Sequence, residues 1–121
     1  MGKRDEALVV IVVEDEADLR ELFVFALEAS KFEVHAASSV AEATKLLDHL
    51  NADVLIADFS LPDGTGPVLL DLCAKARPRA CILLSGHDAR DLPASDFDVL
   101  LLKPVLPERL VREIRERFPD R

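Results

Sequence analysis

Short hydrophobic runs alternate with amphipathic segments along the whole chain. In the amphipathic segments, apolar residues recur three or four positions apart, which is the spacing of a helix that packs one face against a core. Strands that alternate with helices are typical of βαβ crossovers, so the pattern predicts an α/β fold with a doubly wound, five-stranded parallel sheet and helices on both faces. The expected strands cover residues 8–13, 33–37, 54–57, 81–84 and 99–102.

Local signals mark where the helices begin. Ser39, followed three residues later by Glu42, forms a capping-box pattern that predicts the start of the second helix. Pro67 and Pro107 suit the first turn of two further helices. The segment 85–97 has little apolar periodicity, so we expect the fourth helix to be shortened or absent. The first helix is expected to use these apolar positions: Leu19, Leu22, Phe23, Ala26 and Leu27.

Length and charge restrict the class of protein. With 121 residues, half of them hydrophobic, the chain suits a single domain over residues 1–121 with an ordered core of about residues 8–118. The formal net charge of −8 argues against direct binding of nucleic acid. No stretch resembles a membrane span or a signal peptide, and Cys73 and Cys81 lack the spacing of a metal or redox motif. We therefore expect free thiols, a cytoplasmic location and no membrane partner.

Polar side chains follow four of the expected strands. The acidic triplet 14–16 comes directly after the first run, which is hydrophobic enough to be buried on both faces of a sheet. The carboxyl ends of parallel strands lie at one edge, which is where open α/β sheets place their ligand sites. We therefore expect five side chains to converge on one shallow pocket: Glu14, Asp15, Asp58, Ser85 and Lys103.

The residue types at these strand ends suggest their chemistry. Clustered carboxylates are unfavourable unless positive charge neutralises them, and oxygen ligands suit a hard cation such as Mg²⁺ or Mn²⁺. Asp15 and Asp58 can bind such an ion directly, and Glu14 can bind it through a water molecule. Asp58 is the central acid, so we predict that it is a nucleophile that accepts a phosphoryl group. Lys103 and Ser85 then stabilise the phosphoryl oxygens.

Four stretches that contain these residues resemble the motifs of one family: residues 10–16, 57–66, 83–86 and 102–104. In their order and spacing, the chain resembles a response-regulator receiver domain of two-component signalling. The resemblance implies a flavodoxin-like fold with strand order 2-1-3-4-5. It also implies a switch and not a turnover enzyme, because such a domain catalyses only its own phosphorylation, here on Asp58 with Mg²⁺ (Mn²⁺ can substitute), and its own dephosphorylation.

The same resemblance assigns further roles. It makes the backbone carbonyl of Ser60 a metal ligand, makes Lys103–Pro104 a cis peptide and gives Gly66 the sharp turn into the third helix. It places Ser60 and His87 beside the path of the attacking water, where they can tune the lifetime of the phosphoryl group; His87 is alternatively a solvated loop residue. The implied donor is a histidine kinase or histidine phosphotransfer protein, and the output is a downstream protein or a covalently linked effector.

Two positions depart from the family pattern. Leu100 stands three residues before Lys103, where the family commonly has an aromatic residue that rotates on activation. The interval from Ser85 to Lys103 is also about one helical turn shorter than usual. A docking-only pseudo-receiver is therefore one alternative function.

A second alternative is a Mg²⁺-dependent phosphohydrolase of the haloacid-dehalogenase type, which also uses an aspartate nucleophile. That pattern requires a second aspartate two residues after the first, and Ser60 occupies this position. A flavin-binding protein of flavodoxin type fits less well, because the acidic triplet 14–16 would repel a phosphate after the first strand.

Overall fold

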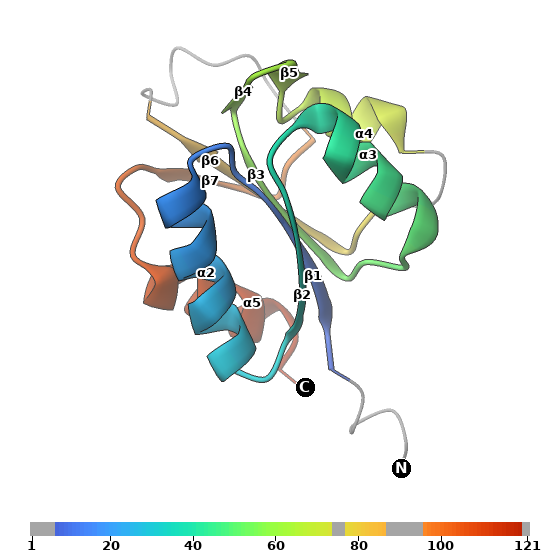
Figure 1. The fold of residues 1–121 in the computed structure, drawn as a ribbon. Coiled ribbons are helices and arrows are strands. Elements are labelled where there is room, and N and C mark those ends of the chain that lie inside the picture. Colours follow the sequence, from blue (N-terminus) through green and yellow to red (C-terminus); the bar gives the residue numbers. More distant parts are fainter. Residues whose placement is uncertain (1–6, 74–76, 87–95, 120–121) are drawn as a thin grey trace.

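Five parallel strands form one sheet in the order β2-β1-β3-β6-β7 (Figure 1). The computed structural model describes residues 7–73, 77–86 and 96–119. Counted along the chain, these five strands have the order 2-1-3-4-5, and every neighbouring pair is parallel, so the expected fold is confirmed. The strands are β1 (Val9–Val13), β2 (Glu33–Ala37), β3 (Val54–Asp58), β6 (Ala80–Ser85) and β7 (Val99–Leu102).

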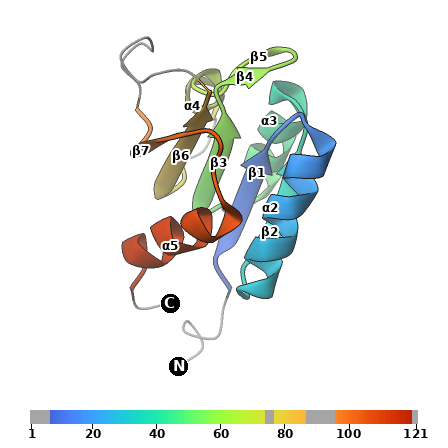
Figure 2. The same cartoon turned by 90° about the vertical axis from the view of Figure 1, so that its left-hand side faces the viewer.

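Helices cover both faces of the sheet (Figures 1 and 2). On one face, α2 (Ala17–Ala29) and α5 (Pro107–Arg117) pack side by side. On the other face lie α3 (Val40–His49) and α4 (Val68–Leu72). Each layer is held by side chains that alternate along the central strands, since successive residues of a strand point to opposite faces.

Strand β1 shows this alternation clearly. Val10 and Val12 pack in the core under α2 and α5, whereas Ile11 and Val13 pack in the core under α3. Both faces of the strand are therefore buried, which is why its sequence is a continuous hydrophobic run and not an alternating one.

The start of α3 differs in detail from the expected capping box. The Ser39 hydroxyl accepts a hydrogen bond from the Glu42 backbone N–H (3.2 Å), as the pattern predicts. The Glu42 carboxylate, however, accepts from the backbone N–H of Ser38 (2.7 Å) and from its hydroxyl (3.0 Å), one residue before the capping residue. Only one half of the capping box therefore forms.

Three features differ from what the sequence predicts or lie outside the described residues. Leu22 in the expected apolar stripe of α2 is 50 % exposed, because α2 packs on the sheet through Phe23 and Leu27. A two-stranded antiparallel sheet, β4 (Ser60–Leu61) and β5 (Gly64–Thr65), was not predicted. The expected shortening or loss of the fourth helix falls largely on residues 87–95, which lie outside the described residues.

Candidate functional site

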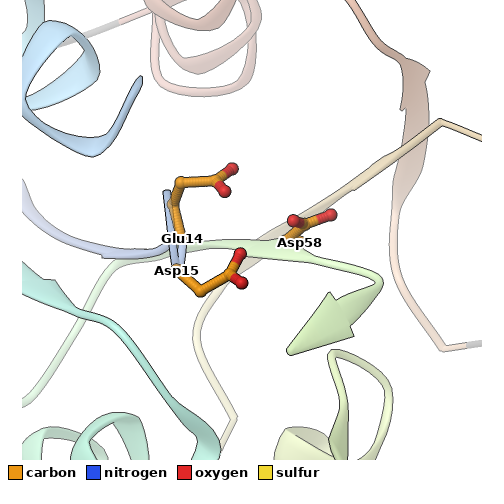
Figure 3. Close-up of side chains that lie close together, drawn as sticks. All are labelled: Glu14, Asp15 and Asp58. Carbon is orange, nitrogen blue, oxygen red and sulfur yellow. The ribbon is translucent and has the colours of Figure 1, made fainter. Parts of the chain in front are cut away.

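The polar residues that follow the strands gather at the carboxyl edge of the sheet. Glu14 and Asp15 directly follow β1, and Asp58 is the last residue of β3. Ser85 ends β6, and Lys103 directly follows β7. Because β1 and β3 are adjacent parallel strands, their ends bring the three carboxylates together, and Figure 3 shows these side chains directed toward a common space.

The three carboxylates form a compact acidic cluster. One oxygen from each of Glu14, Asp15 and Asp58 lies within 4.8 Å of the others. Glu14 is only 1 % exposed and Asp58 only 7 % exposed, whereas Asp15 is exposed to solvent. Like charges at this spacing repel one another, and burial strengthens the repulsion. The cluster therefore requires a positive partner.

Lys103 supplies part of that positive charge. Its Nζ donates to Asp58 Oδ2 at 2.9 Å and to Glu14 Oε1 at 3.1 Å. Burial acts to lower the pKa of Lys103, but the hydrogen bonds and charges of these two carboxylates outweigh it, so the pKa is raised and the ammonium stays charged. One lysine faces three carboxylates, so the cluster keeps an excess of negative charge.

Glu14 has the most constrained carboxylate of the cluster. Its burial raises its pKa, against the lowering effect of hydrogen bonds from the backbone N–H of Glu16 and from Lys103. The Glu16 N–H lies 3.2 Å from Glu14 Oε2. The backbone of Glu14 is also fixed, because its N–H donates to the Ala37 carbonyl at 3.0 Å and its own carbonyl accepts from Arg20 Nη1 at 2.8 Å.

A second set of contacts fixes the backbone around Asp58. The Phe59 N–H donates to the Leu84 carbonyl (2.7 Å), and the Gly66 N–H donates to the Phe59 carbonyl (2.9 Å). A Cβ at position 66 would lie 2.6 Å from the carbonyl oxygen of Asp58 and 2.9 Å from Leu83 Cδ1, so only glycine fits without a shift. Gly66 therefore allows the chain to close tightly behind Asp58.

The remaining predicted site residues occupy different surroundings. Ser85 is buried, and its carbonyl accepts from the backbone N–H of Lys103 at 2.7 Å, which holds the end of β6 beside the end of β7. The Lys103–Pro104 peptide bond is cis. Ser60 is exposed and pairs with Thr65 in the small hairpin; metal binding by its carbonyl stays a prediction. His87 lies outside the described residues.

The contacts of two residues near the site, Arg20 and Asp63, cannot be predicted from the sequence. Arg20 donates to the Glu14 carbonyl from the second turn of α2, and Asp63 accepts from backbone N–H groups of α3. An arginine on a polar helix face looks like any solvated residue in sequence. The Asp63–Gly64 pair predicts a turn, but its partners are more than twenty residues away along the chain.

The donor set of the cluster suits a hard divalent cation. Three carboxylates offer oxygen ligands from two adjacent strand ends, and one of them, Asp15, faces solvent, through which an ion can enter. The excess negative charge beside Lys103 also favours a bound cation, because a cation relieves the mutual repulsion of the carboxylates. The residues present therefore fit a metal ion.

Comparison with known proteins assigns the chain to a family. The sequence profile of the response regulator receiver domain matches residues 10–115, and the chain belongs to this family. It is a phosphoacceptor signalling domain of two-component systems. Within the residues that the structure describes, no helix is long and apolar enough to cross a membrane.

Individual relatives agree with the family assignment. The chain is 32 % identical over 120 residues to the response regulator protein PilR of Pseudomonas aeruginosa, with 91 % of this chain and 27 % of PilR covered. It is 33 % identical over 114 residues to the sensor kinase CckA of Brucella abortus, with 88 % of this chain and 12 % of CckA covered. This chain thus spans about a quarter or less of the length of these two relatives. Neither relative supports the phosphohydrolase or pseudo-receiver alternatives.

Solved structures with a similar fold include receiver domains. A CheY-like receiver domain from Methylobacillus flagellatus superposes with a TM-score of 0.80 at 24 % identity, covering 93 % of this chain and 99 % of that one. At this identity the likeness concerns the fold alone. The roles of individual residues in this chain therefore depend on the geometry of its own site.

Proposed function

We propose that Asp58 is the residue that receives the phosphoryl group. The observation that carries this proposal is the contact of Asp58 with Lys103 at 2.9 Å inside the acidic cluster. At this position, a carboxylate nucleophile lies beside the positive charge that stabilises the phosphoryl oxygens during transfer.

The transfer exchanges one bond to phosphorus for another. A carboxylate oxygen of Asp58 attacks the phosphorus of a phosphohistidine, the P–N bond breaks, and an acyl phosphate forms. The imidazole leaves with the bonding electron pair and is protonated from solvent. Lys103 already donates to Asp58 and is placed to donate to a phosphoryl oxygen, and the Ser85 hydroxyl is proposed as a second donor.

Mg²⁺ is the cofactor that we propose for this site, with Mn²⁺ as a substitute. Glu14, Asp15 and Asp58 would hold it together with the backbone carbonyl of Ser60. When bound, the ion screens the carboxylates from an incoming anionic phosphoryl group. The cluster alone would repel that anion, because one lysine does not balance three carboxylates.

The proposed donor is a histidine kinase or histidine phosphotransfer protein in the cytoplasm, and the proposed output is a downstream protein or a linked effector. The chemistry is self-catalysed: the domain promotes its own phosphorylation and the later attack of water. Ser60 and His87 are proposed to border the path of that water. Within the described residues, five strands from β1 to β7 form one sheet with helices on both faces, which supports the proposal that residues 1–121 form one domain.

Phosphorylation of variants tests this assignment. With acetyl phosphate and Mg²⁺, the wild type is expected to gain one phosphoryl group by intact-mass spectrometry, and Asp58→Asn is expected to gain none. Asp71→Asn is the matched control, because Asp71 is an exposed aspartate on α4, and it should behave as the wild type. A phosphoryl group on the Asp58→Asn variant would contradict the proposal.

A further inference from the structure

Asp63 joins the hairpin that follows Asp58 to the start of helix α3. Its Oδ1 accepts a hydrogen bond from the backbone N–H of Val40 at 2.7 Å, and its Oδ2 accepts from the N–H of Ala41 at 3.0 Å. Both donors belong to the first turn of α3, whose N–H groups have no partner within the helix. A carboxylate is the strongest acceptor for such groups, because its charge also interacts favourably with the helix dipole.

The tip of the hairpin packs where these hydrogen bonds form. Asp63 lies in the turn between β4 and β5, and Figure 1 shows this hairpin beside the beginning of α3. A Cβ placed on Gly64, the next residue, would lie 3.2 Å from Val40 Cγ2, so the turn and the helix are in close contact. Leu61 on β4 is buried in the same core as Val40. The tip is thus attached to α3 by two hydrogen bonds and by apolar packing.

The base of the same hairpin is attached to Asp58. The Gly66 N–H closes the segment 59–66 by donating to the Phe59 carbonyl, and Gly66 lies against the carbonyl oxygen of Asp58. The segment therefore has two attachment points, one at Asp58 and one at the first turn of α3. A shift of the tip moves the backbone next to Asp58, because only a short closed segment connects them.

We propose that Asp63 is a positioning residue for phosphoryl transfer, which fixes the segment 59–66 against α3 and couples the state of Asp58 to the first turn of that helix. The proposal rests on the proposed role of Asp58. Asp63 acts through the backbone of the hairpin and does not contact the reacting atoms. Two consequences follow: loss of Asp63 slows phosphorylation, and occupation of the Asp58 site changes the hydrogen bonds of Val40 and Ala41.

Two substitutions of Asp63 and one control separate positioning from stability. Asp63→Ala removes both acceptors, whereas Asp63→Asn keeps one acceptor oxygen and replaces the other by an amide donor. Ser39→Ala is the matched control, because the Ser39 hydroxyl caps the same helix end by accepting from Glu42 N–H but does not belong to the hairpin. All three variants should lower the melting temperature, and rates are compared well below the lowest of these temperatures.

The first measurement is the rate of phosphorylation by acetyl phosphate with Mg²⁺. Asp63→Ala is expected to react about tenfold more slowly than the wild type, which is less than the roughly hundredfold loss that a 1 Å misplacement of reacting groups can cause. Asp63→Asn should lie between the two, and Ser39→Ala should react at the wild-type rate. Wild-type rates in both Asp63 variants would overturn the proposal, and so would equal slowing in Ser39→Ala.

The second measurement uses only the wild type, so it does not depend on whether a variant folds. Hydrogen exchange of the Val40 and Ala41 amides is followed by NMR in the wild type with Mg²⁺, before and after addition of beryllofluoride, a phosphoryl mimic. Occupation of the site should slow the exchange of both amides. Unchanged exchange at saturating beryllofluoride would overturn the coupling.

The outcomes also distinguish this proposal from the assignment of Asp58. If phosphorylation occurs on a residue other than Asp58, the proposed function fails. If Asp58 is phosphorylated normally and Asp63→Ala is phosphorylated equally fast, only the role of Asp63 fails.

Discussion

Lys103 is shared between two carboxylates at the centre of the site. Its ammonium group contacts Asp58 and Glu14, whereas Asp15 is exposed at the rim of the cluster. The three acids thus differ in their surroundings although they lie within 4.8 Å of one another. Asp15 contributes to the repulsion within the cluster, and in the described residues the ion pairs of Lys103 are with Glu14 and Asp58.

This difference makes Asp15 the informative position for the balance between stability and metal binding. Asp15→Asn is expected to raise the melting temperature of the metal-free protein by about 1–3 °C, because it removes repulsion worth a fraction of a kcal/mol at an exposed site. It should also remove the rise in melting temperature that Mg²⁺ produces in the wild type. Thermal melts with and without Mg²⁺ measure both effects.

The control for Asp15→Asn is Asp71→Asn, which removes one negative charge from α4 without touching the cluster. This variant should keep the full response to Mg²⁺. A full Mg²⁺ response in Asp15→Asn as well would mean that the metal binds elsewhere.

Single residues of the site were predicted from sequence to very different extents. The position of Asp58 after a buried run indicated that it is a strand end, and parallel strands place such ends together. The hydrogen bond from Arg20 to the Glu14 carbonyl could not be predicted from sequence, because every residue type has a backbone carbonyl that can accept one. Sequence therefore predicted that the three carboxylates and Lys103 meet, but not what fixes their backbone.

Among the secondary-structure elements, the long buried strands were predicted best. β1 is a continuous apolar run, and β3 and β6 are apolar up to their last residues, Asp58 and Ser85. The bounds of β1 and β3 differ from the expected ones by one residue at one end, and those of β6 by one residue at each end. β4 and β5 have two residues each, which is too short for any periodicity. The Asp63–Gly64 pair indicates the turn between them, but their contacts with α3 are set by tertiary structure.

The cap of α3 should give this element a distinct dependence on pH. Hydrogen bonds from the Val40 and Ala41 N–H groups lower the pKa of Asp63 below its ordinary value of 3.8. A carboxyl group whose pKa is lower in the folded protein stabilises the fold above its unfolded pKa, and this stabilisation is lost as the pH falls through the folded pKa. The contribution of Asp63 is therefore complete at neutral pH and declines below pH 3.8.

Urea unfolding of the wild type and of Asp63→Asn over a range of pH values measures this contribution. The wild type should be the more stable protein near neutral pH, and the difference in free energy of unfolding should shrink as the solution is acidified below pH 3.8. The general loss of stability in acid cancels in this difference, because both proteins share all other carboxylates. A difference that stays constant throughout acidification would mean that Asp63 does not act as a charged cap.

In the molecule as a whole, the sequence pattern predicted the layers but not every surface. The division of the core into two halves follows directly from the alternation of β1 and its neighbours. Phe25 on α2 and Leu106 before α5 are 73 % and 70 % exposed. Phe25 lies off the expected apolar stripe of α2, whereas Leu22 lies on that stripe and is nevertheless 50 % exposed. Which apolar side chains remain outside depends on how the helices sit on the sheet, which is decided only by packing.

The response of the whole molecule to phosphorylation should be weak at Leu100. This half-buried residue on β7 has no ring that could rotate, whereas Lys103 and Ser85 are expected to contact the phosphoryl group. A ligand shifts a conformational equilibrium only through contacts that differ between the two states. Beryllofluoride with Mg²⁺ should therefore change the backbone NMR shifts of Ser85 and Lys103 more than those of Leu100.

The Asp58→Asn variant is the control for that experiment, because the mimic should not bind to it and its spectrum should not change. Changes in the wild type that are confined to the neighbourhood of Leu100 would contradict this prediction. A mimic that binds without perturbing any of these positions would instead favour the docking-only pseudo-receiver.

The ion pairs of Lys103 also have a consequence for the order in which the site is synthesised and folded. Lys103 follows the last strand of the sheet, and its partners lie 45 and 89 residues earlier in the chain. During synthesis these two carboxylates are therefore made before Lys103, and a chain that stops short of β7 lacks the lysine that contacts them. Contacts that close such long loops form late, since their entropy cost must first be offset by other structure. On the proposed role of Lys103 in stabilising the phosphoryl group, a newly made copy is expected to become able to accept that group only after β7 has docked and Lys103 has reached the carboxylates.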